Sequence, residues 1–258
     1  PLLVILSYVV SVLGSFTALQ LAIAIPNATS SAHRWRAVAA AGLAMGGGAI
    51  WAMHFIAMLA CQMNVEVTYD LPITLGSAVV AVVSCMAGLA IAGTGLFNWG
   101  KLIIAGVLMG LGVTGMHYAG MSAMLMAADT VYNSTLVMAS AGIAIVASIV
   151  ALWLAFNLRG WGQMLGSALV MGVAVCGMHY TGMLAASFVP NEARASLVAG
   201  GVSGGYLGVG IFVVTTALLA AVLTMSLLRQ RQRSMVDSLR ATGIAVDANN
   251  QTYVTGQT

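Results

Sequence analysis

A histidine flanked by methionines recurs three times in the chain, in the segments "AMHFIAM", "GMHYAGM" and "GMHYTGM". These segments cover residues 52–58, 115–121 and 177–183. On an α-helix, residues four apart differ by about 40° around the axis and share a face. Each histidine is followed by a methionine at this spacing, which gives the pairs His54 and Met58, His117 and Met121, and His179 and Met183. Each copy therefore offers one imidazole and one thioether to a common partner.

Further side chains of the three segments lie at the margin of that shared face. A methionine precedes each histidine and a tyrosine follows the second and third, about 100° around the helix on either side. These secondary ligand candidates are Met53, Met116, Met178, Tyr118 and Tyr180. Cys61 lies seven residues after His54 on the same helical face, where it is either a further ligand or a small apolar filler.

This set of side chains favours a soft transition metal. Thioether sulfur selects copper(I), and imidazole binds copper in either oxidation state as well as zinc and iron. Hard cations take carboxylate oxygens, which the three segments lack. An uncharged ligand set also suits an apolar location, because no anion has to be desolvated. We therefore predict copper, with haem bound by axial histidines as the alternative. A purely structural role, in which the methionines pack and the histidines hydrogen-bond, is a further alternative.

The helices that must position these side chains follow from the composition. Hydrophobic residues make up 60% of the chain and charged residues only 6%, which a water-soluble globule cannot accommodate. A helix needs about 20 apolar residues to cross a bilayer. Runs of this kind cover residues 2–25, 37–60, 71–93, 102–127, 134–157, 163–188 and 205–228. The sequence predicts an all-α membrane protein with seven transmembrane helices, whose first run is long enough to stay in the membrane and not be cleaved as a signal peptide.

The basic residues predict the orientation of the bundle. Cytoplasmic loops are enriched in Lys and Arg, and eight of the nine basic residues lie in segments that share a side with the C-terminus. Arg194 lies on the opposite side with four of the six acidic residues, Glu66, Asp70, Asp129 and Glu192. His33 falls beside Arg34 in the first cytoplasmic loop and is expected to be solvated. We therefore expect the N-terminus outside and the C-terminus in the cytoplasm. The net charge of +3 reflects this topology and does not indicate a nucleic-acid partner.

The three motifs belong to an internal repeat. Their histidines are 63 and 62 residues apart, a period that holds two spans, so the motifs lie on the second, fourth and sixth helices. These helices run in the same direction, and each motif falls near the outer end of its helix. Upstream, "MGGG", "MGLG" and "MGVA" begin about two turns before each motif, and the first copy has one extra residue. Small residues such as Gly106 and Gly110 are expected to let helices pack closely. Because ionisable residues inside spans are costly and usually functional, three at one depth predict a shared site near the outer face.

The repeated segment, complete as Met178, His179, Tyr180 and Thr181, resembles the MHYT domain, a bacterial membrane-embedded sensory domain. The resemblance covers the first six helices. It implies a copper site near the outer face that senses a diatomic gas, O2, CO or NO. It implies ligands at the three pairs of histidine and methionine, with the methionines before the histidines as secondary ones. It also implies a link to cytoplasmic output modules such as diguanylate cyclases, phosphodiesterases, histidine kinases or DNA-binding domains.

The sequence departs from the MHYT pattern at three positions. Phe55 replaces the tyrosine in the first copy, and Ile56 and Ala119 replace the threonine in the first and second copies. Phenol and hydroxyl groups therefore cannot be ligands in every copy.

Function and domain organisation follow from these observations. Residues 1–200 are expected to form the sensory domain, with six helices in three two-helix repeats. Residues 201–228 would form the seventh helix and 229–258 a cytoplasmic connector, with the output domain absent or truncated. The connector is too short for a catalytic domain, and a constellation of catalytic groups is lacking, so we expect no enzyme in this chain.

The expected protein is a multi-pass sensor of the bacterial inner membrane that detects a diatomic gas, redox state or copper and signals to a fused or associated cytoplasmic domain. A homodimer is an assembly that the sequence leaves open. A copper or proton transporter is the alternative function, because internal repeats also occur in transporters.

Overall fold

The computed structural model describes the 258-residue chain except residues 1, 62–65, 158–159, 242–243, 247–251 and 255–258. The chain divides into two compact units, residues 1–219 and 220–258, which are described separately.

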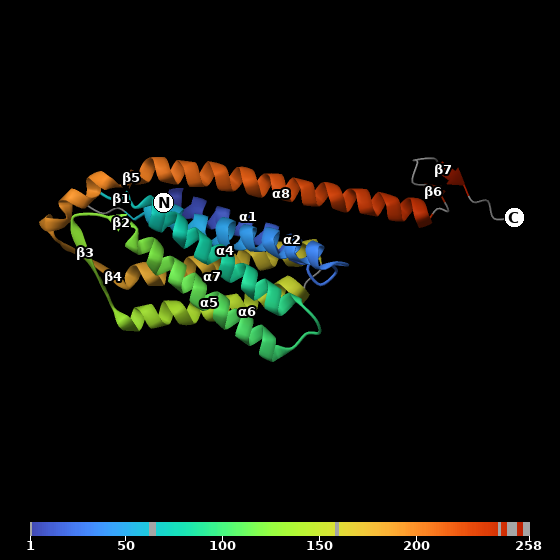
Figure 1. The fold of residues 1–258 in the computed structure, drawn as a ribbon, viewed down its shortest axis with the longest axis horizontal. Helices are drawn as coiled ribbons and strands as arrows, with labels where there is room; N and C mark the ends of the chain where they lie inside the picture. The colour runs from blue at the N-terminus through green and yellow to red at the C-terminus, as the bar shows by residue number, and fades with distance from the viewer. Residues whose placement is uncertain (1, 62–65, 158–159, 242–243, 247–251, 255–258) are drawn as a thin grey trace. The chain divides into compact units, whose positions relative to one another are not determined.

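Seven apolar helices long enough to cross a membrane are present among the described residues, as the sequence predicts (Figure 1). The first is α1 (Leu2–Ala22), and the second span consists of α2 (Ser31–Gly42), the π-helix η1 (Leu43–Trp51) and α3 (Ala52–Leu59). The others are α4 (Leu71–Gly93), α5 (Trp99–Ser122), α6 (Ser134–Asn157), α7 (Trp161–Leu184) and α8 (Gly204–Ala241). Polar caps mark helix starts: Asp70 Oδ1 accepts from the N–H of Ile73 at 2.9 Å before α4, and Asn98 Oδ1 accepts from that of Gly100 at 2.7 Å before α5. The predicted seven-helix membrane fold is confirmed.

The second span begins earlier than the sequence predicts. Ser30 Oγ accepts a hydrogen bond from the N–H of His33 at 3.2 Å and caps the start of α2. His33 and Arg34 therefore lie in the first turn of a helix, and their placement in a loop is wrong. The apolar run begins only at residue 37, so it does not reveal a first turn built from polar and charged residues.

Six of the spans form a closed ring in which the motif-bearing helices alternate with the others. Contacts join α1 to η1, η1 to α4, α4 to α5, α5 to α6, α6 to α7 and α7 back to α1. α3, α5 and α7 also contact one another inside the ring. A Cβ added at Gly106 would lie 2.8 Å from Ile149 Cα, and one at Gly110 would lie 2.5 Å from Ile145 Cα. The expected packing role of these two glycines is confirmed, and the ring brings the three motifs to its centre.

The π-helix η1 explains the extra residue of the first repeat. Met45 lies nine residues before His54, whereas Met109 and Met171 each lie eight residues before the histidine of their copy. One residue inserted into an α-helix would rotate the preceding part by about 100°. A π-turn absorbs the surplus residue, because its hydrogen bonds close from i to i+5. Met45, Met109 and Met171 all line one cavity, so the register of the first copy is kept.

Deleting a residue from η1 is therefore expected to preserve the histidine arrangement. Removal of Gly47 shortens the separation between Met45 and His54 to eight residues, which is the separation in the other two copies. Removal of Leu111, an exposed residue in the corresponding stretch of α5, takes away a residue that is not surplus and turns His117 by about 100° relative to the preceding part of its helix. Copper binding by the two purified variants tests this expectation. Equal loss of binding in both would contradict the role of η1.

Short strands and a 3-10 helix cover the end of the first unit at which the motif helices finish (Figure 1). One antiparallel sheet has the order β2 (Met124–Leu125), β1 (Thr68–Tyr69) and β5 (Val202–Ser203), with one strand from each loop that follows a motif helix. A second sheet pairs β3 (Ala128–Tyr132) with β4 (Ala186–Pro190), and the 3-10 helix η2 covers Glu192–Gly200. We refer to these strands and η2 as the cap. The helices expected over 102–127 and 163–188 end early, at Ser122 and Leu184, because pairing between loops replaces helix there.

The second unit contains the end of α8 and an antiparallel hairpin of β6 (Ile244–Val246) and β7 (Thr252–Val254). The connector predicted over residues 229–258 includes this hairpin, and part of it lies outside the described residues.

An ion pair on the surface of the cap joins β3 to η2. Arg194 Nη1 donates to Asp129 Oδ1 at 2.9 Å, and Asn191 Nδ2 donates to Asp129 Oδ2 at 2.7 Å. Hydrogen bonds from Arg194 and Asn191 hold the pKa of Asp129 below its ordinary value of 3.8. Since the folded-state pKa is the lower one, the pair stabilises the fold at neutral pH, and this contribution is lost as the pH falls through the lowered pKa.

Asp129→Asn is expected to lower the thermal stability of the cap slightly at pH 7, because exposed ion pairs contribute little. The difference from wild type should shrink in high salt and on acidification. Thermal unfolding in detergent, followed by circular dichroism at several pH values, measures it. Glu192→Gln, an equal change of charge in the first turn of η2, is the control. A deficit of Asp129→Asn that persists at low pH would contradict the assignment.

Candidate metal centre

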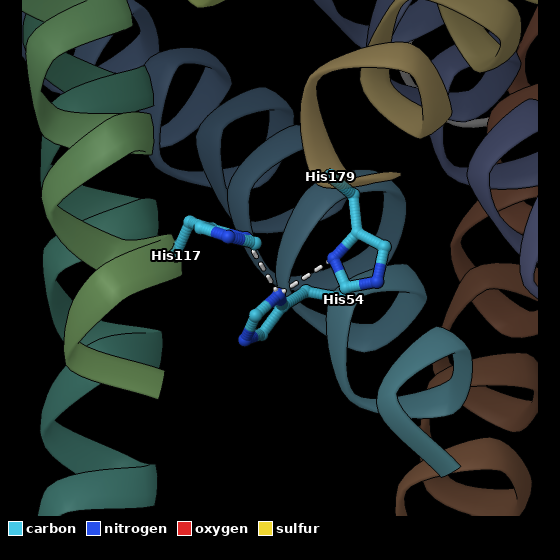
Figure 2. Close-up of side chains that lie close together, drawn as sticks. All are labelled: His54, His117 and His179. Atoms are coloured by element: carbon cyan, nitrogen blue, oxygen red, sulfur yellow. Dashed lines mark hydrogen bonds between the residues drawn. The ribbon is translucent and has the colours of Figure 1, made fainter. Parts of the chain in front are cut away.

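Three buried histidines meet at the centre of the bundle. His54 on α3, His117 on α5 and His179 on α7 are at most 1% exposed. Nδ1 of His54 lies 3.0 Å from Nδ1 of His179 and 3.1 Å from Nδ1 of His117. Figure 2 shows the rings of His117 and His179 directed at this atom from two other helices. The structure thus brings together the three histidines of the repeated motif, which we call the triad.

Nδ1 of His54 cannot form two well-aligned hydrogen bonds with its two neighbours. A neutral imidazole carries one N–H and one lone pair. Nδ1 of His54 therefore presents either one hydrogen or one lone pair to two neighbours. With neutral tautomers, the two contacts therefore either share this one hydrogen or lone pair in a bifurcated arrangement, or one of them has no hydrogen bond. A cation between the rings would be met by all three lone pairs, which removes the mismatch.

The spacing of the triad fits a small transition-metal ion. Metal–imidazole bonds of about 2.0–2.1 Å place the nitrogens of a trigonal or tetrahedral site roughly 3.3–3.6 Å apart. The observed 3.0 and 3.1 Å to Nδ1 of His54 are slightly shorter than this, and the ligand atoms of the three histidines all lie within 4.8 Å of one another. Movements of the rings on this scale would bring the nitrogens to such spacings. Among the described residues, no cysteine or acidic side chain joins the histidines, and Cys61 is exposed. The triad could therefore hold a metal ion through three neutral imidazoles.

Two glycines make room for the imidazole rings. A Cβ added at Gly120 would lie 3.0 Å from Cδ2 of His54, and one at Gly182 would lie 2.8 Å from Cδ2 of His117. Both glycines lie three residues after the histidine of their own motif, where the first copy has Ala57. The second and third motifs thus each supply an imidazole and the space for a neighbour's imidazole. Sequence reasoning missed this role, although the shared motif position was visible.

The outward nitrogens of the rings are also enclosed. Nε2 of each triad histidine is buried, and within the described part of the chain it has no hydrogen-bond partner. With all three Nδ1 lone pairs facing a cation, each Nε2 would carry the hydrogen. Among the described residues nothing accepts that hydrogen, so the outer side of each ring is apolar.

The methionines four residues after the histidines lie on the cap side of the triad. Met58 and Met121 are buried in an apolar cluster with Tyr69 of β1, and Met183 packs against this cluster. Burial raises the pKa of Tyr69 to about 12, so its hydroxyl stays neutral and adds no charge. The methionines before the histidines, Met53, Met116 and Met178, are buried as well. A ligand role for any of these thioethers stays a prediction.

The residue after each histidine packs its ring edge-on against that histidine. The ring centroids are 5.0 Å apart for Phe55, 4.8 Å for Tyr118 and 5.0 Å for Tyr180. Tyr118 Oη shares a hydrogen bond of 2.9 Å with Ser140 Oγ, and Thr181 Oγ1 donates to the carbonyl of Gly177 at 2.8 Å. Ring packing is common to all three copies, which explains why phenylalanine can replace tyrosine in the first.

Comparison with known proteins agrees with the repeat. The chain matches the MHYT family, described as the N-terminal repeat of bacterial signalling proteins, over residues 47–105, 110–168 and 172–236. Each match groups a motif helix with the helix that follows it. The third match therefore takes in part of α8, whereas the grouping expected from the sequence leaves residues 205–228 outside the repeats.

Several curated bacterial proteins are similar to the chain. The bifunctional diguanylate cyclase/cyclic di-GMP phosphodiesterase MucR of Pseudomonas aeruginosa is 39% identical over 94% of this chain and 36% of its own length. The cyclic di-GMP phosphodiesterase NbdA of the same organism is 35% identical, and the signalling protein YkoW of Bacillus subtilis is 31% identical. Each of these two covers 72% of this chain, which spans 24% of their lengths. No solved structure matches the chain.

The family and the apolar helices together settle the class of the protein. Seven helices among the described residues are long and apolar enough to cross a membrane, and with the family match they make it a multi-pass protein of the bacterial inner membrane. It spans little more than a third of its relative MucR. The chain belongs to the MHYT family of bacterial signalling proteins, and it consists mostly of the sensory domain that contains the repeats.

Proposed function

We propose that the triad binds one copper ion, and that the domain reports the state of this ion to a cytoplasmic output module. The observation that carries the proposal is the convergence of three buried Nδ1 atoms, of which that of His54 faces both others at hydrogen-bond distance.

The chemistry of the site supports copper(I). Three neutral imidazoles supply no negative charge, so a monovalent ion leaves less uncompensated charge in the apolar interior than a divalent one. Methionines gather on both sides of the triad, and thioether sulfur selects copper(I). Met58, Met121 and Met183 are proposed as additional ligands on the cap side.

The geometry favours a bare ion over haem. A haem iron with two axial histidines has the macrocycle between the ligand nitrogens. Nitrogens 3.0 and 3.1 Å apart leave no room for such a ring. Freshly purified protein should therefore lack a Soret band, and a Soret band that disappears on substitution of the triad would favour haem instead.

The proposed signal is a change at the bound ion. Copper, when bound, supplies a centre whose preferred coordination changes with oxidation state or on binding a diatomic gas such as O2, CO or NO. The imidazoles hold it from three helices, so a change in the positions of the rings moves α3, α5 and α7 relative to one another. Two contacts lead from the second span to α8: Gly48 packs against Leu219, and Leu59 packs against Gly208. The seventh helix is thus placed to receive the movement.

The proposed output is a cytoplasmic signalling domain. MucR and NbdA are named for cyclic di-GMP synthesis and breakdown, so we expect an output that acts on this nucleotide. The distribution of basic residues supports a cytoplasmic end of α8 and a cap on the outer side. Residues 229–258 would then connect the sensor to its output.

Elemental analysis of protein purified without added metal tests the proposal. Wild type is expected to contain about one copper ion more per chain than a variant with His54, His117 and His179 replaced by alanine. Circular dichroism and size-exclusion chromatography check that the variant folds. Copper that persists unchanged in a folded triple variant would contradict the site.

A transporter is the competing class of function. Copper flux into proteoliposomes separates the two, because a sensor should show none. Flux that depends on the triad would favour transport.

A further inference from the structure

Three methionines from equivalent positions of the repeat line a second buried site. Met45 of η1, Met109 of α5 and Met171 of α7 are 1%, 1% and 6% exposed, and all three line one cavity of about 30 Å³. They lie eight or nine residues before the triad histidines. That separation is about 12 Å along the helices, on the side away from the cap. The cavity is therefore distinct from the triad.

The register of Met45 is maintained at a structural cost. Without the π-helix η1, the surplus residue of the first copy would rotate Met45 out of line with Met109 and Met171. π-turns are rare in helices and frequently occur at functional sites. The three thioethers thus share a position that a uniform α-helix would not have given them.

A serine hydroxyl also meets the cavity. Ser15 of α1 is fully buried and lines the cavity, and its Oγ has no hydrogen-bond partner among the described residues. In the same helix, Ser7 Oγ donates to the carbonyl of Val4 and Thr17 Oγ1 to that of Leu13, both at 2.8 Å. Ser11 Oγ is buried and without a partner among the described residues, as Ser15 Oγ is, but Ser11 is not among the residues that line the cavity. A buried polar atom without a partner is costly, so the hydroxyl of Ser15 points to a ligand in the cavity.

From these observations we propose that the cavity binds a copper(I) ion through Met45, Met109 and Met171, with the hydroxyl of Ser15 completing the site. Thioethers are soft, neutral ligands that select copper(I), and a monovalent ion is the least costly metal to place among neutral ligands in an apolar interior. A volume of about 30 Å³ exceeds the 10–15 Å³ or so that one water needs. Met109 Sδ lies towards Gly88 of α4, and the three rotatable bonds of methionine allow its sulfur to turn into the cavity.

The site would make the domain a carrier of two copper ions in series within one bundle. Met178, which directly precedes His179, lines the same cavity. The thioether site therefore extends towards the triad and is placed to exchange copper(I) with it. Occupancy of the two sites could then report copper supply independently of any ligand at the triad.

Titration of the purified chain with copper(I), against a chromophoric copper(I) chelator, tests the proposal. Wild type is expected to bind about two ions, and Met45→Leu, Met109→Leu and Met171→Leu combined should remove one. The alanine variant of the triad should lose the other ion and keep this one. Its X-ray absorption spectrum with bound copper(I) should show sulfur neighbours at about 2.3 Å, the length of metal–sulfur bonds.

Met124→Leu, Met126→Leu and Met164→Leu combined are the matched control, because these methionines are also buried but do not line the cavity. This variant should keep both ions. A folded Met45, Met109 and Met171 variant with the wild-type stoichiometry would overturn the proposal and leave the cavity to water or to no ligand.

The proposals for the two sites can be contradicted separately, because each triple variant is expected to remove only the ion of its own site. If the Met45, Met109 and Met171 variant does not fold, the absorption spectrum of the triad variant with copper(I) decides, because Met58, Met121 and Met183 can also give sulfur neighbours in the wild type. If the triad variant does not fold either, nitrogen neighbours without sulfur in the wild-type spectrum at two equivalents of copper(I) would exclude the thioether site.

Discussion

Replacing His54 by alanine is expected to weaken copper(I) binding at the triad by at least about a hundredfold. Loss of a group that only supports a metal ligand costs ten- to a hundredfold, and loss of a ligand itself should exceed that range. His54 is also the residue whose Nδ1 contacts the Nδ1 atoms of both other triad histidines, at 3.0 and 3.1 Å. Competition with a copper(I) chelator measures the affinity.

His33→Ala is the matched control for this substitution. His33 is the one histidine of the sequence outside the triad, and it lies exposed in the first turn of α2. It should leave the copper affinity unchanged. Thermal unfolding of the metal-free proteins separates loss of a ligand from loss of the fold. Similar affinities for His54→Ala and wild type, with the fold intact, would exclude His54 as a ligand.

Gly182→Ala is expected to lower the copper affinity of the triad by about ten- to a hundredfold. The new Cβ would lie 2.8 Å from Cδ2 of His117, which is shorter than any ordinary contact between carbon atoms, so the ring has to move. Gly120→Ala should displace His54 in the same way. Alanine favours a helix over glycine by about 1 kcal/mol. A loss of affinity therefore cannot be ascribed to a weaker helix.

Gly177→Ala and Gly115→Ala are the controls for the two glycine substitutions. These glycines lie five residues earlier in α7 and α5, and a Cβ at either position meets nothing within 4 Å. Both should retain the wild-type affinity and gain slightly in thermal stability. Equal losses at all four glycines would mean that the effect comes from the helices and not from the rings.

The helices and the register of the histidines were predictable from the sequence. Seven apolar runs of sufficient length define seven spans. A repeat period that holds two spans requires that His54, His117 and His179 lie on helices running in the same direction. Histidines at one depth can meet inside a ring of helices, and in the structure these three do.

The cap was not predictable in the same way. Strands of two residues have no recognisable periodicity, and their existence depends on pairing between distant loops. Thr68 pairs with Leu125 on one side and with Ser203 on the other. The apolar character of residues 123–127 and 185–188 continues into the cap, so hydrophobicity alone extends α5 and α7 too far.

Two further features depend on neighbours that a single sequence does not identify. The surplus residue before His54 was visible, but its accommodation in η1 follows from the need to keep both ends of the second span in register. Gly120 and Gly182 were visible as part of the motif. Their role depends on which ring of another helix lies against them.

Nitrogen-15 NMR of protein labelled only at histidine tests the central claim most directly. The chain contains four histidines, and copper(I) is diamagnetic, so each ring can be followed with the ion bound. Binding is predicted to shift Nδ1 of His54, His117 and His179 together and to leave all three rings with the hydrogen on Nε2, while His33 does not change. Titration with copper(I) that leaves the three triad rings unchanged, or that shifts only one of them, would contradict a copper ion held by the triad.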